Sequence, residues 1–119
     1  MRLLALTLLG SLTAAPALAE MEGQTAFNNS CRTCHTMKQG DNRQGPSLAG
    51  IVGRKAGSLP DYNYSPSMKQ SGITWDEANL DQFIANPEQV VNGNAMKPYG
   101  GITDAAQRKV IIDFLKSGG

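Results

Sequence analysis

One short motif, Cys-Arg-Thr-Cys-His at residues 31–35, constrains this chain more than any other part of its sequence. The chain contains two cysteines and one histidine, so the motif holds its whole supply of both residue types. Two cysteines three positions apart, followed directly by histidine, have the spacing of a c-type haem attachment site. The motif therefore predicts one haem, bound covalently through Cys31 and Cys34, with His35 as a ligand to the iron.

Other interpretations of the motif agree less well with the residues available. A zinc site needs four protein ligands, or three and a water, and Cys31, Cys34 and His35 supply three at most. A thioredoxin-like Cys-x-x-Cys pair is expected near a strand–helix unit, which this sequence does not indicate. A disulfide between the two cysteines leaves the histidine unexplained. Covalent haem accounts for all three residues.

The N-terminal residues indicate export. Arg2 precedes an apolar run over residues 3–9, and small residues follow as far as Ala19, which is typical of a secretory signal peptide. The alternative is an uncleaved membrane anchor, but glycine, serine and proline interrupt the run before the about 20 residues that a spanning helix needs. We expect cleavage after Ala19 to remove residues 1–19 and to leave 20–119 as a single domain in the periplasm.

Composition limits how this domain folds and what it binds. Within residues 20–119 ten basic side chains balance ten acidic ones, so the domain lacks the basic field that nucleic-acid binding requires. The chain has thirteen glycines but only one Trp, three Tyr and three Phe. A small domain of this kind buries a modest core, so a buried haem has to supply much of the apolar volume. We therefore expect the haem-free form to be unfolded or molten.

Capping residues and apolar spacing predict an all-α chain whose helices are joined by glycine-rich loops. Ser65 and Pro66 are typical of an N-cap and the first position of a short helix. Thr74 and Glu77 have the spacing of a capping box at the start of the next helix. The expected helices run from about Met21 to Thr33, from Pro66 to Gly72, from Thr74 to Asn86-Pro87 and from Thr103-Asp104 to Gly118, and a long loop covers about 37–60.

Three of these helices have an apolar or small face. Gly23, Phe27 and Cys31 share one face of the first helix, and all of that face except Phe27 is small, so another element can approach it closely. The other two expected apolar faces are Leu80, Phe83 and Ile84 on the third helix and Val110, Ile111, Phe114 and Leu115 on the last.

In order and spacing these features resemble the class I c-type cytochromes, and more closely the soluble bacterial and mitochondrial cytochrome c type. The resemblance covers nearly all of residues 20–119. It implies a small cytochrome c fold in which the terminal helices cross, with Gly23 and Phe27 against Ile111 and Phe114, and in which loops wrap one covalent haem. The matching segments are Gly23, Phe27 and Cys31 at intervals of four, Gly45-Pro46-Ser47-Leu48, residues 50–57, Tyr62-x-Tyr64-Ser65, Gly72-Ile73-Thr74-Trp75, Asn86-Pro87 and Phe114-Leu115-Lys116.

The iron needs a second axial ligand on the face of the ring opposite His35. Without another histidine, a methionine thioether is the expected donor. Of the five methionines, one leaves with the signal peptide and two lie on the side of His35, which leaves Met68 and Met96. The resemblance implies Met96, because the family carries its ligand in the loop that matches residues 92–98. A methionine in a short helix, such as Met68, is typical of packing.

The resemblance also implies which residues contact the rest of the cofactor. The carbonyl of Pro46 is expected to accept the outer ring N–H of the axial histidine and so fix its orientation. Arg54, Tyr64 and Trp75 lie where the family hydrogen-bonds or neutralises a haem propionate. Asn94 stands where mitochondrial relatives have a threonine, and it can still donate to a propionate. The alternative is that the tryptophan is plain core and the arginine is solvated.

The chain departs from the mitochondrial pattern near the expected methionine ligand. Phe83 replaces a tyrosine that hydrogen-bonds the methionine sulfur, so the iron–sulfur bond lacks that support. Residues 96–102 are about one residue longer than the usual segment. Glu88, Gln89 and Ala95 replace lysines that surround the haem edge, so we expect a more apolar docking surface with weaker electrostatic steering.

The resemblance implies a one-electron carrier, and not an enzyme, whose iron is held six-coordinate by His35 and Met96. The expected partners are redox proteins: a donor dehydrogenase or reductase and an acceptor oxidase or reductase. We expect a monomer that has no membrane span once the signal peptide is cleaved. Two alternatives remain open: a dedicated electron-transfer subunit of a dehydrogenase complex, and a ligand-binding or peroxidatic haem protein with a labile Met96. The lack of a distal histidine weighs against the second.

Overall fold

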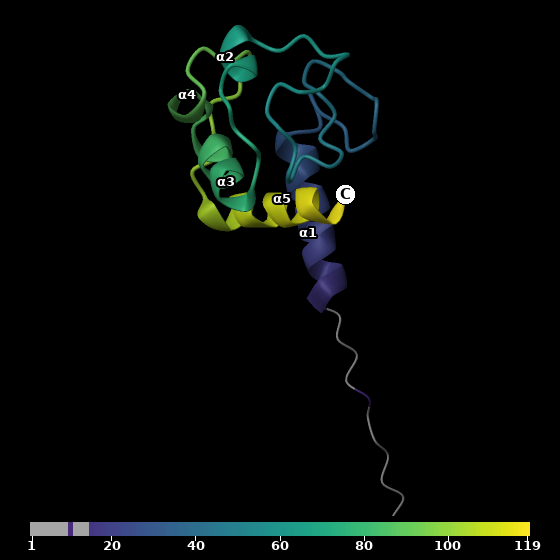
Figure 1. Ribbon diagram of the computed structural model, residues 1–119. Coiled ribbons are helices and arrows are strands. Elements are labelled where there is room, and N and C mark those ends of the chain that lie inside the picture. The colour runs from purple at the N-terminus through teal and green to yellow at the C-terminus, as the bar shows by residue number, and fades with distance from the viewer. Residues whose placement is uncertain (1–9, 11–14) are drawn as a thin grey trace, which may run out of the picture.

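The computed structural model describes residue 10 and residues 15–119, and within them the fold is all-α, as predicted (Figure 1). The only extended pairing in this part of the chain is one isolated antiparallel bridge between Lys55 and Thr74. The expected signal peptide falls largely on residues outside the description. The helices are α1 (Ala15–Ser30), α2 (Pro66–Lys69), α3 (Glu77–Ala85), α4 (Pro87–Val90) and α5 (Ala105–Ser117).

The two terminal helices, α1 and α5, cross and pack directly against each other (Figure 1). A methyl group on Gly23 would lie 2.8 Å from the Val110 carbonyl oxygen and 2.9 Å from the Phe114 Cβ, so the helices touch at a position that only glycine allows. Beside this contact the rings of Phe27 and Phe114 pack with their centroids 5.2 Å apart. The expected crossing of the terminal helices is confirmed.

The bounds of α1 differ from the expectation at both ends. The helix begins at Ala15, before the expected Met21, and it continues through the expected cleavage point after Ala19. It ends at Ser30, before the expected Thr33. The main-chain N–H groups of the next two residues both donate to the Phe27 carbonyl, at 2.7 and 3.1 Å, which tightens the chain into a turn. Both cysteines therefore lie in this turn and not on the helix.

The start of α3 lies two positions later than the predicted capping box at Thr74. Asp76 is the N-cap: its carboxylate accepts the Asn79 N–H at 2.7 Å, and the Asn79 side-chain oxygen accepts the Asp76 N–H at 2.8 Å. Trp75 cannot join the helix, because its N–H and carbonyl bond to the backbone of residues 53–54. Hydrogen bonds to a segment distant along the chain thus prevent the helix from starting at the capping box that the sequence predicted at Thr74.

The other helix ends depend on local capping. Ser65 caps α2 as predicted, with its side-chain oxygen accepting the Met68 N–H at 3.2 Å. Asp104 caps α5, and Gly118 ends it with a φ of 90°, a conformation that glycine favours. The short helix α4 was not predicted. It begins at Pro87, directly after the Asn86 that ends α3, because proline suits the first position of a helix.

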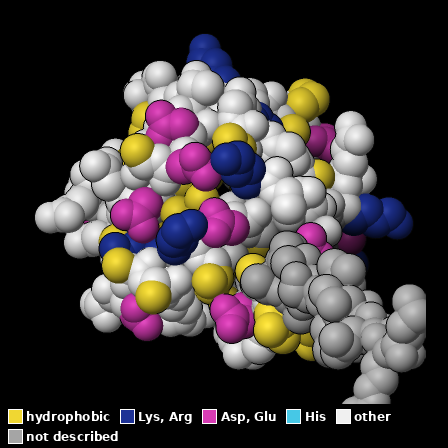
Figure 2. Space-filling view, turned by 90° about the horizontal axis from the view of Figure 1, so that it is seen from below, with side chains coloured by type: hydrophobic (Ala, Val, Ile, Leu, Met, Phe, Trp, Pro, Cys, Tyr) yellow, Lys and Arg dark blue, Asp and Glu magenta, His cyan; other side chains and the backbone are white. Residues whose placement is uncertain are grey.

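The core lies where α3 and α5 meet, with Ile111 fully buried. Two ion pairs join the same helices: Arg108 to Asp81 at 2.8 Å and Lys116 to Glu77 at 3.3 Å. Figure 2 shows the molecule from below, and on the face seen there acidic and basic side chains are interspersed.

Candidate functional site

A cavity of about 300 Å³ lies between the turn after α1, the long loop, α2, α3, α5 and the loop that precedes α5. Cys31, Cys34, His35 and Met96 all line it, so the structure brings together the residues of the motif and a methionine more than sixty positions away. Apolar side chains from α3 and α5 line much of the remaining wall, namely Leu80, Phe83, Ile84, Ile111 and Leu115.

The turn after α1 presents the two cysteines and the histidine to the cavity. The N–H groups of Cys34 and His35 both donate to the Cys31 carbonyl, at 3.1 and 2.9 Å. The two cysteines are free thiols, without a disulfide between them. Burial, with a smaller contribution from Cys34, raises the pKa of the Cys31 thiol to about 11. Both sulfurs are therefore available for bonds to a cofactor.

The imidazole of His35 is buried and held in one orientation. Its Nδ1 lies 2.8 Å from the Pro46 carbonyl oxygen, the contact that the resemblance implied. A Cβ on Gly45 would lie 2.6 Å from the same Nδ1, so the close approach of chain and ring requires glycine there. Burial lowers the pKa of His35. The ring is thus favoured as a neutral donor whose Nε2 is left for the cavity.

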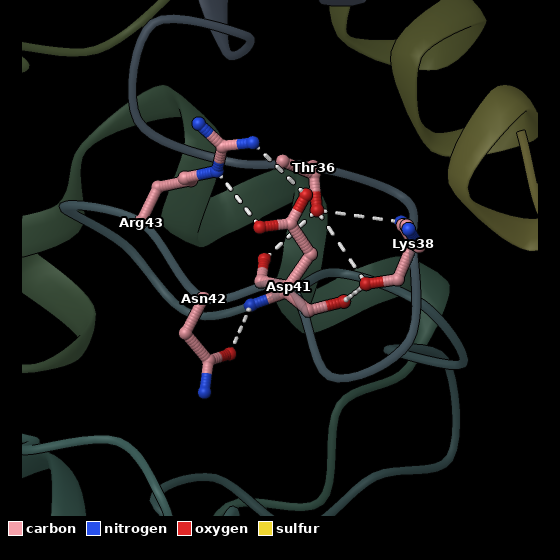
Figure 3. Close-up of polar contacts among 6 residues, drawn as sticks. Thr36, Lys38, Asp41, Asn42 and Arg43 are labelled. Atoms are coloured by element: carbon pink, nitrogen blue, oxygen red, sulfur yellow. Dashed lines mark hydrogen bonds and ion pairs between the residues drawn. The ribbon is translucent and has the colours of Figure 1, made fainter.

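The segment that carries the Pro46 carbonyl is itself fixed by hydrogen bonds (Figure 3). The Thr36 hydroxyl donates to the Asp41 carbonyl at 2.9 Å, and the Ser47 hydroxyl donates to the Lys38 carbonyl at 2.7 Å. The Ser47 N–H donates to the Asn42 side-chain oxygen at 2.9 Å. These bonds close residues 36–47 into a compact loop, so the acceptor for the histidine is rigidly placed.

Two methionines reach the cavity. Met96 comes from the loop between α4 and α5, and Met68 comes from α2; both are partly buried and both line the wall. These are the two candidates that remained from the residues alone. Either thioether is a soft donor of the kind that haem iron accepts.

Three further residues that were expected to contact the cofactor also line the cavity. The guanidinium of Arg54 donates to the Ser47 carbonyl at 2.7 Å, which holds its charge beside the cavity. Trp75 is buried and packs against Phe83 at a centroid distance of 5.0 Å, and Tyr64 is partly buried. Arg54, Tyr64 and Trp75 thus bring N–H, O–H and positive groups to a mainly apolar cavity.

The position of Asn94 differs from the expectation. It is buried, but it is not part of the cavity lining. Its side-chain N–H groups donate to Glu88 at 2.9 Å and to the Val91 carbonyl at 3.0 Å. Its side-chain oxygen accepts the Met96 N–H at 2.8 Å. Acceptors on and directly after α4 thus bind the amide that was expected to donate to a propionate.

Sequence reasoning missed Tyr99, which also lines the cavity. Its hydroxyl donates to the Ile84 carbonyl at 2.5 Å, and the Ile102 N–H donates to the same oxygen at 3.0 Å. Burial raises the pKa of Tyr99 to about 12. The available signal was the extra length of residues 96–102, because an inserted residue changes which side chain faces inward.

The donor set fits a flat, mainly apolar cofactor with acidic side groups. Two thiols, one oriented imidazole and two thioethers line one cavity, and Arg54 lines it as well. In the part of the chain that the structure describes, no group of three or more His, Cys, Asp or Glu residues could hold a metal ion without a cofactor. Over the same residues, no helix has the length and apolar character to cross a membrane.

Comparison with known proteins agrees with this geometry. A family model described as Cytochrome c matches residues 20–119. The chain is 42% identical over 97 residues to cytochrome c2 iso-1 of Magnetospirillum fulvum, covering 81% of this chain and 97% of that protein. It is 41% identical over 103 residues to cytochrome c2 of Rhodopila globiformis, covering 87% and 96%. Among solved structures, cytochrome cH from Methylobacterium extorquens is similar with a TM-score of 0.75 and 39% identity, covering 82% and 97%.

Proposed function

The chain belongs to the cytochrome c family, and on that premise we propose that it carries single electrons between redox proteins, with His35 and Met96 as the axial ligands of its haem iron. It binds one haem c, covalently through Cys31 and Cys34. When bound, this group supplies a one-electron iron couple whose potential His/Met ligation raises.

One observation carries the proposal: His35, oriented by the Pro46 carbonyl at 2.8 Å, lines the same cavity as Met96. The hydrogen bond fixes the ring and leaves Nε2 as the donor, and it strengthens that donor. Met96 lies in the loop position that the family uses, whereas Met68 lies within α2. His35 and Met96 would together hold a bound haem from both sides, and the group would then supply one-electron chemistry without a position for a further ligand.

The cavity walls support electron transfer over catalysis. Leu80, Phe83 and Ile84 are buried along one wall and exclude water. Arg54 is held by the Ser47 carbonyl, where its charge can offset a propionate, and Tyr64 and Trp75 are the expected hydrogen-bond donors to the same groups. We propose that the chain itself is a carrier and catalyses no reaction.

The exposed part of the cavity lining supports docking with weak electrostatic steering. It consists mainly of uncharged residues and two lysines, namely Gln44, Lys55, Ala95, Lys97 and Pro98. One of the two lysines, Lys97, pairs with Glu88 at 3.0 Å, which leaves, among the residues described, one uncompensated charge in this lining. We propose transient contact with a donor dehydrogenase or reductase and with an acceptor oxidase or reductase, by a monomer.

We also propose that the protein acts in the periplasm after cleavage behind Ala19. The contacts that Gly23 and Phe27 of α1 make with α5 lie beyond that point. Cleavage would therefore leave these contacts in place. Haem attachment outside the cytoplasm and an export signal are two independent reasons for the same compartment.

The absorption spectrum of the purified holoprotein tests the ligand assignment. We expect a low-spin spectrum with a methionine–iron charge-transfer band and no change with carbon monoxide. Met96→Ala should abolish the band, admit carbon monoxide and lower the reduction potential, whereas Met68→Leu should change none of these. Loss of the band in Met68→Leu alone would reassign the ligand. Carbon monoxide binding by the unaltered protein would favour the ligand-binding alternative.

A further inference from the structure

The loop that bears Met96 is organised around one carboxylate, that of Glu88 on α4. This side chain is a departure from the mitochondrial pattern. Four groups of the loop donate to it, and they come from residues on both sides of Met96. The Asn94 amide and the Lys97 ammonium reach Oε1, at 2.9 and 3.0 Å. The Gly93 N–H and the Asn92 amide reach Oε2, at 3.1 and 3.3 Å.

Asn94 connects this carboxylate to the main chain of the ligand. It is 3% exposed, and its amide is used on both sides: the N–H groups donate to Glu88 and to a carbonyl of α4's end, and the oxygen accepts the Met96 N–H at 2.8 Å. A buried amide with every partner in place has one favoured orientation. The position of the Met96 backbone therefore depends on where Glu88 holds Asn94.

We propose that Glu88 is a positioning residue, which through Asn94 holds the Met96 loop in the conformation that keeps the thioether on the iron. This inference rests on the proposed function, in which Met96 is the ligand. An ionised carboxylate is the fitting centre for such a loop, because it only accepts hydrogen bonds and can satisfy four donors at once. No neutral side chain offers the same number of acceptor sites.

The arrangement differs from an ordinary surface ion pair. The exposed pair with Lys97 would contribute little alone, because solvent screens it. Three of the four contacts are instead hydrogen bonds to uncharged N–H groups of the loop, and charge-assisted bonds of this type are the stronger kind. The Gly93 N–H, and after it Lys97, lowers the pKa of the Glu88 carboxyl, so the group stays ionised. Gly93 has a φ of 79°, which lets the chain turn its N–H toward the carboxylate.

The downstream side of the loop has a separate anchor. Tyr99 and Ile102 both bond to the Ile84 carbonyl, as described above. Glu88 therefore fixes the part of the loop that contains residues 92–97. Without its carboxylate, these residues keep mainly the short-range hydrogen bonds among themselves. A loop fixed at one end should open more often, and each opening exposes the iron to competing ligands.

Imidazole titration of the oxidised holoprotein measures this opening. The apparent affinity of the protein for imidazole rises with the fraction of molecules in which Met96 has left the iron. We expect Glu88→Ala and Asn94→Ala to bind imidazole about tenfold more tightly than the unaltered protein, and Glu88→Gln to have an affinity between that of the unaltered protein and that of Glu88→Ala. The matched control is Glu77→Ala, because Glu77 also pairs with a lysine, at 3.3 Å, on a similarly exposed surface. Its imidazole affinity should be unchanged.

Hydrogen exchange of the loop amides separates this inference from the ligand assignment. The Met96 N–H should exchange faster in Glu88→Ala and Asn94→Ala than in Glu77→Ala, while the amides of α5 keep their protection. If the unaltered protein proves to lack methionine ligation, the proposed function fails and exchange alone decides whether Glu88 orders the loop. With methionine ligation present, an imidazole affinity in Glu88→Ala equal to that of Glu77→Ala would overturn the proposal. Whether or not methionine is the ligand, an exchange rate of the Met96 N–H that is the same in Glu88→Ala as in the unaltered protein would also overturn it.

Discussion

At the scale of single residues, the positions of the His35 ring and of Met96 depend on neighbouring residues that themselves supply no donor atom to the cavity. His35 has its orientation because the Pro46 carbonyl lies 2.8 Å from Nδ1, and that approach is possible because Gly45 has no side chain. Asn94 is a second example, since its amide positions the Met96 backbone without lining the cavity. Neither Gly45 nor Asn94 supplies an atom to the cavity chemistry, yet each determines where a donor atom lies.

Replacement of Gly45 by alanine tests this dependence. The new methyl would lie 2.6 Å from the His35 Nδ1, so the ring or the chain has to move and the bond to Pro46 is lost. We expect the free energy of unfolding of the holoprotein to fall by about 1–3 kcal/mol. Denaturant titration followed by the haem spectrum measures the change. Gly100→Ala is the control, because nothing lies within 4 Å of a methyl there; equal stability of the two variants would contradict the role of Gly45.

At the scale of elements, the cavity is bounded by helices that meet at a few close contacts. α1 and α5 touch at Gly23, and α3 is tied to α5 by the pairs Arg108–Asp81 and Lys116–Glu77. Arg108 also donates to the Ile102 and Thr103 carbonyls, both at 2.9 Å, so one side chain joins α3, α5 and the loop before α5. The elements are thus fixed by specific side chains as well as by apolar packing.

The crossing of α1 and α5 predicts the effect of Gly23→Ala. Alanine favours an isolated helix by about 1 kcal/mol over glycine. Here the added methyl would lie 2.8 Å from the Val110 carbonyl oxygen and force the helices apart. We expect a net loss of about 1–3 kcal/mol in the free energy of unfolding, because overpacking outweighs the propensity. Thermal unfolding of Gly23→Ala and of Gln24→Ala, a substitution at an exposed neighbour, measures this loss of stability. If both variants are more stable than the unaltered protein, the space between α1 and α5 can accommodate a methyl group and the prediction is wrong.

At the scale of the whole molecule, the polypeptide is built around space for its cofactor. The cavity of about 300 Å³ is walled by residues of the hydrophobic core, among them Trp75, Leu80 and Ile111. Without the haem these apolar walls would face water in place of the group that they are shaped to contact, and the stabilisation from burying them would be lost. A small domain has little stability to spare for such a loss, because its total is about 5–15 kcal/mol.

The haem-free chain is therefore expected to lack a cooperative fold. Residues 20–119 produced without haem attachment should retain part of their helical circular dichroism but show no sharp thermal transition, because the walls of the cavity have lost their common partner. The holoprotein measured in the same buffer is the reference. A sharp transition in the haem-free chain would mean that the crossing helices suffice for folding.

Features that depend on neighbouring residues could be predicted before the fold was known. The haem attachment motif, the cap of α2 at Ser65 and the end of α5 at Gly118 follow from fixed short spacings, and the apolar face of α3 follows from helical periodicity. These features hold wherever the segment lies in the fold. The all-α class follows from the same local rules.

Features that depend on residues distant along the chain could not be predicted in this way. The cap of α3 moved to Asp76 because Trp75 pairs with residues 53–54. Tyr99 joined the wall because its hydroxyl reaches the end of α3. In both cases a backbone acceptor brought close by folding competes with the local preference, and no spacing along the chain encodes that proximity.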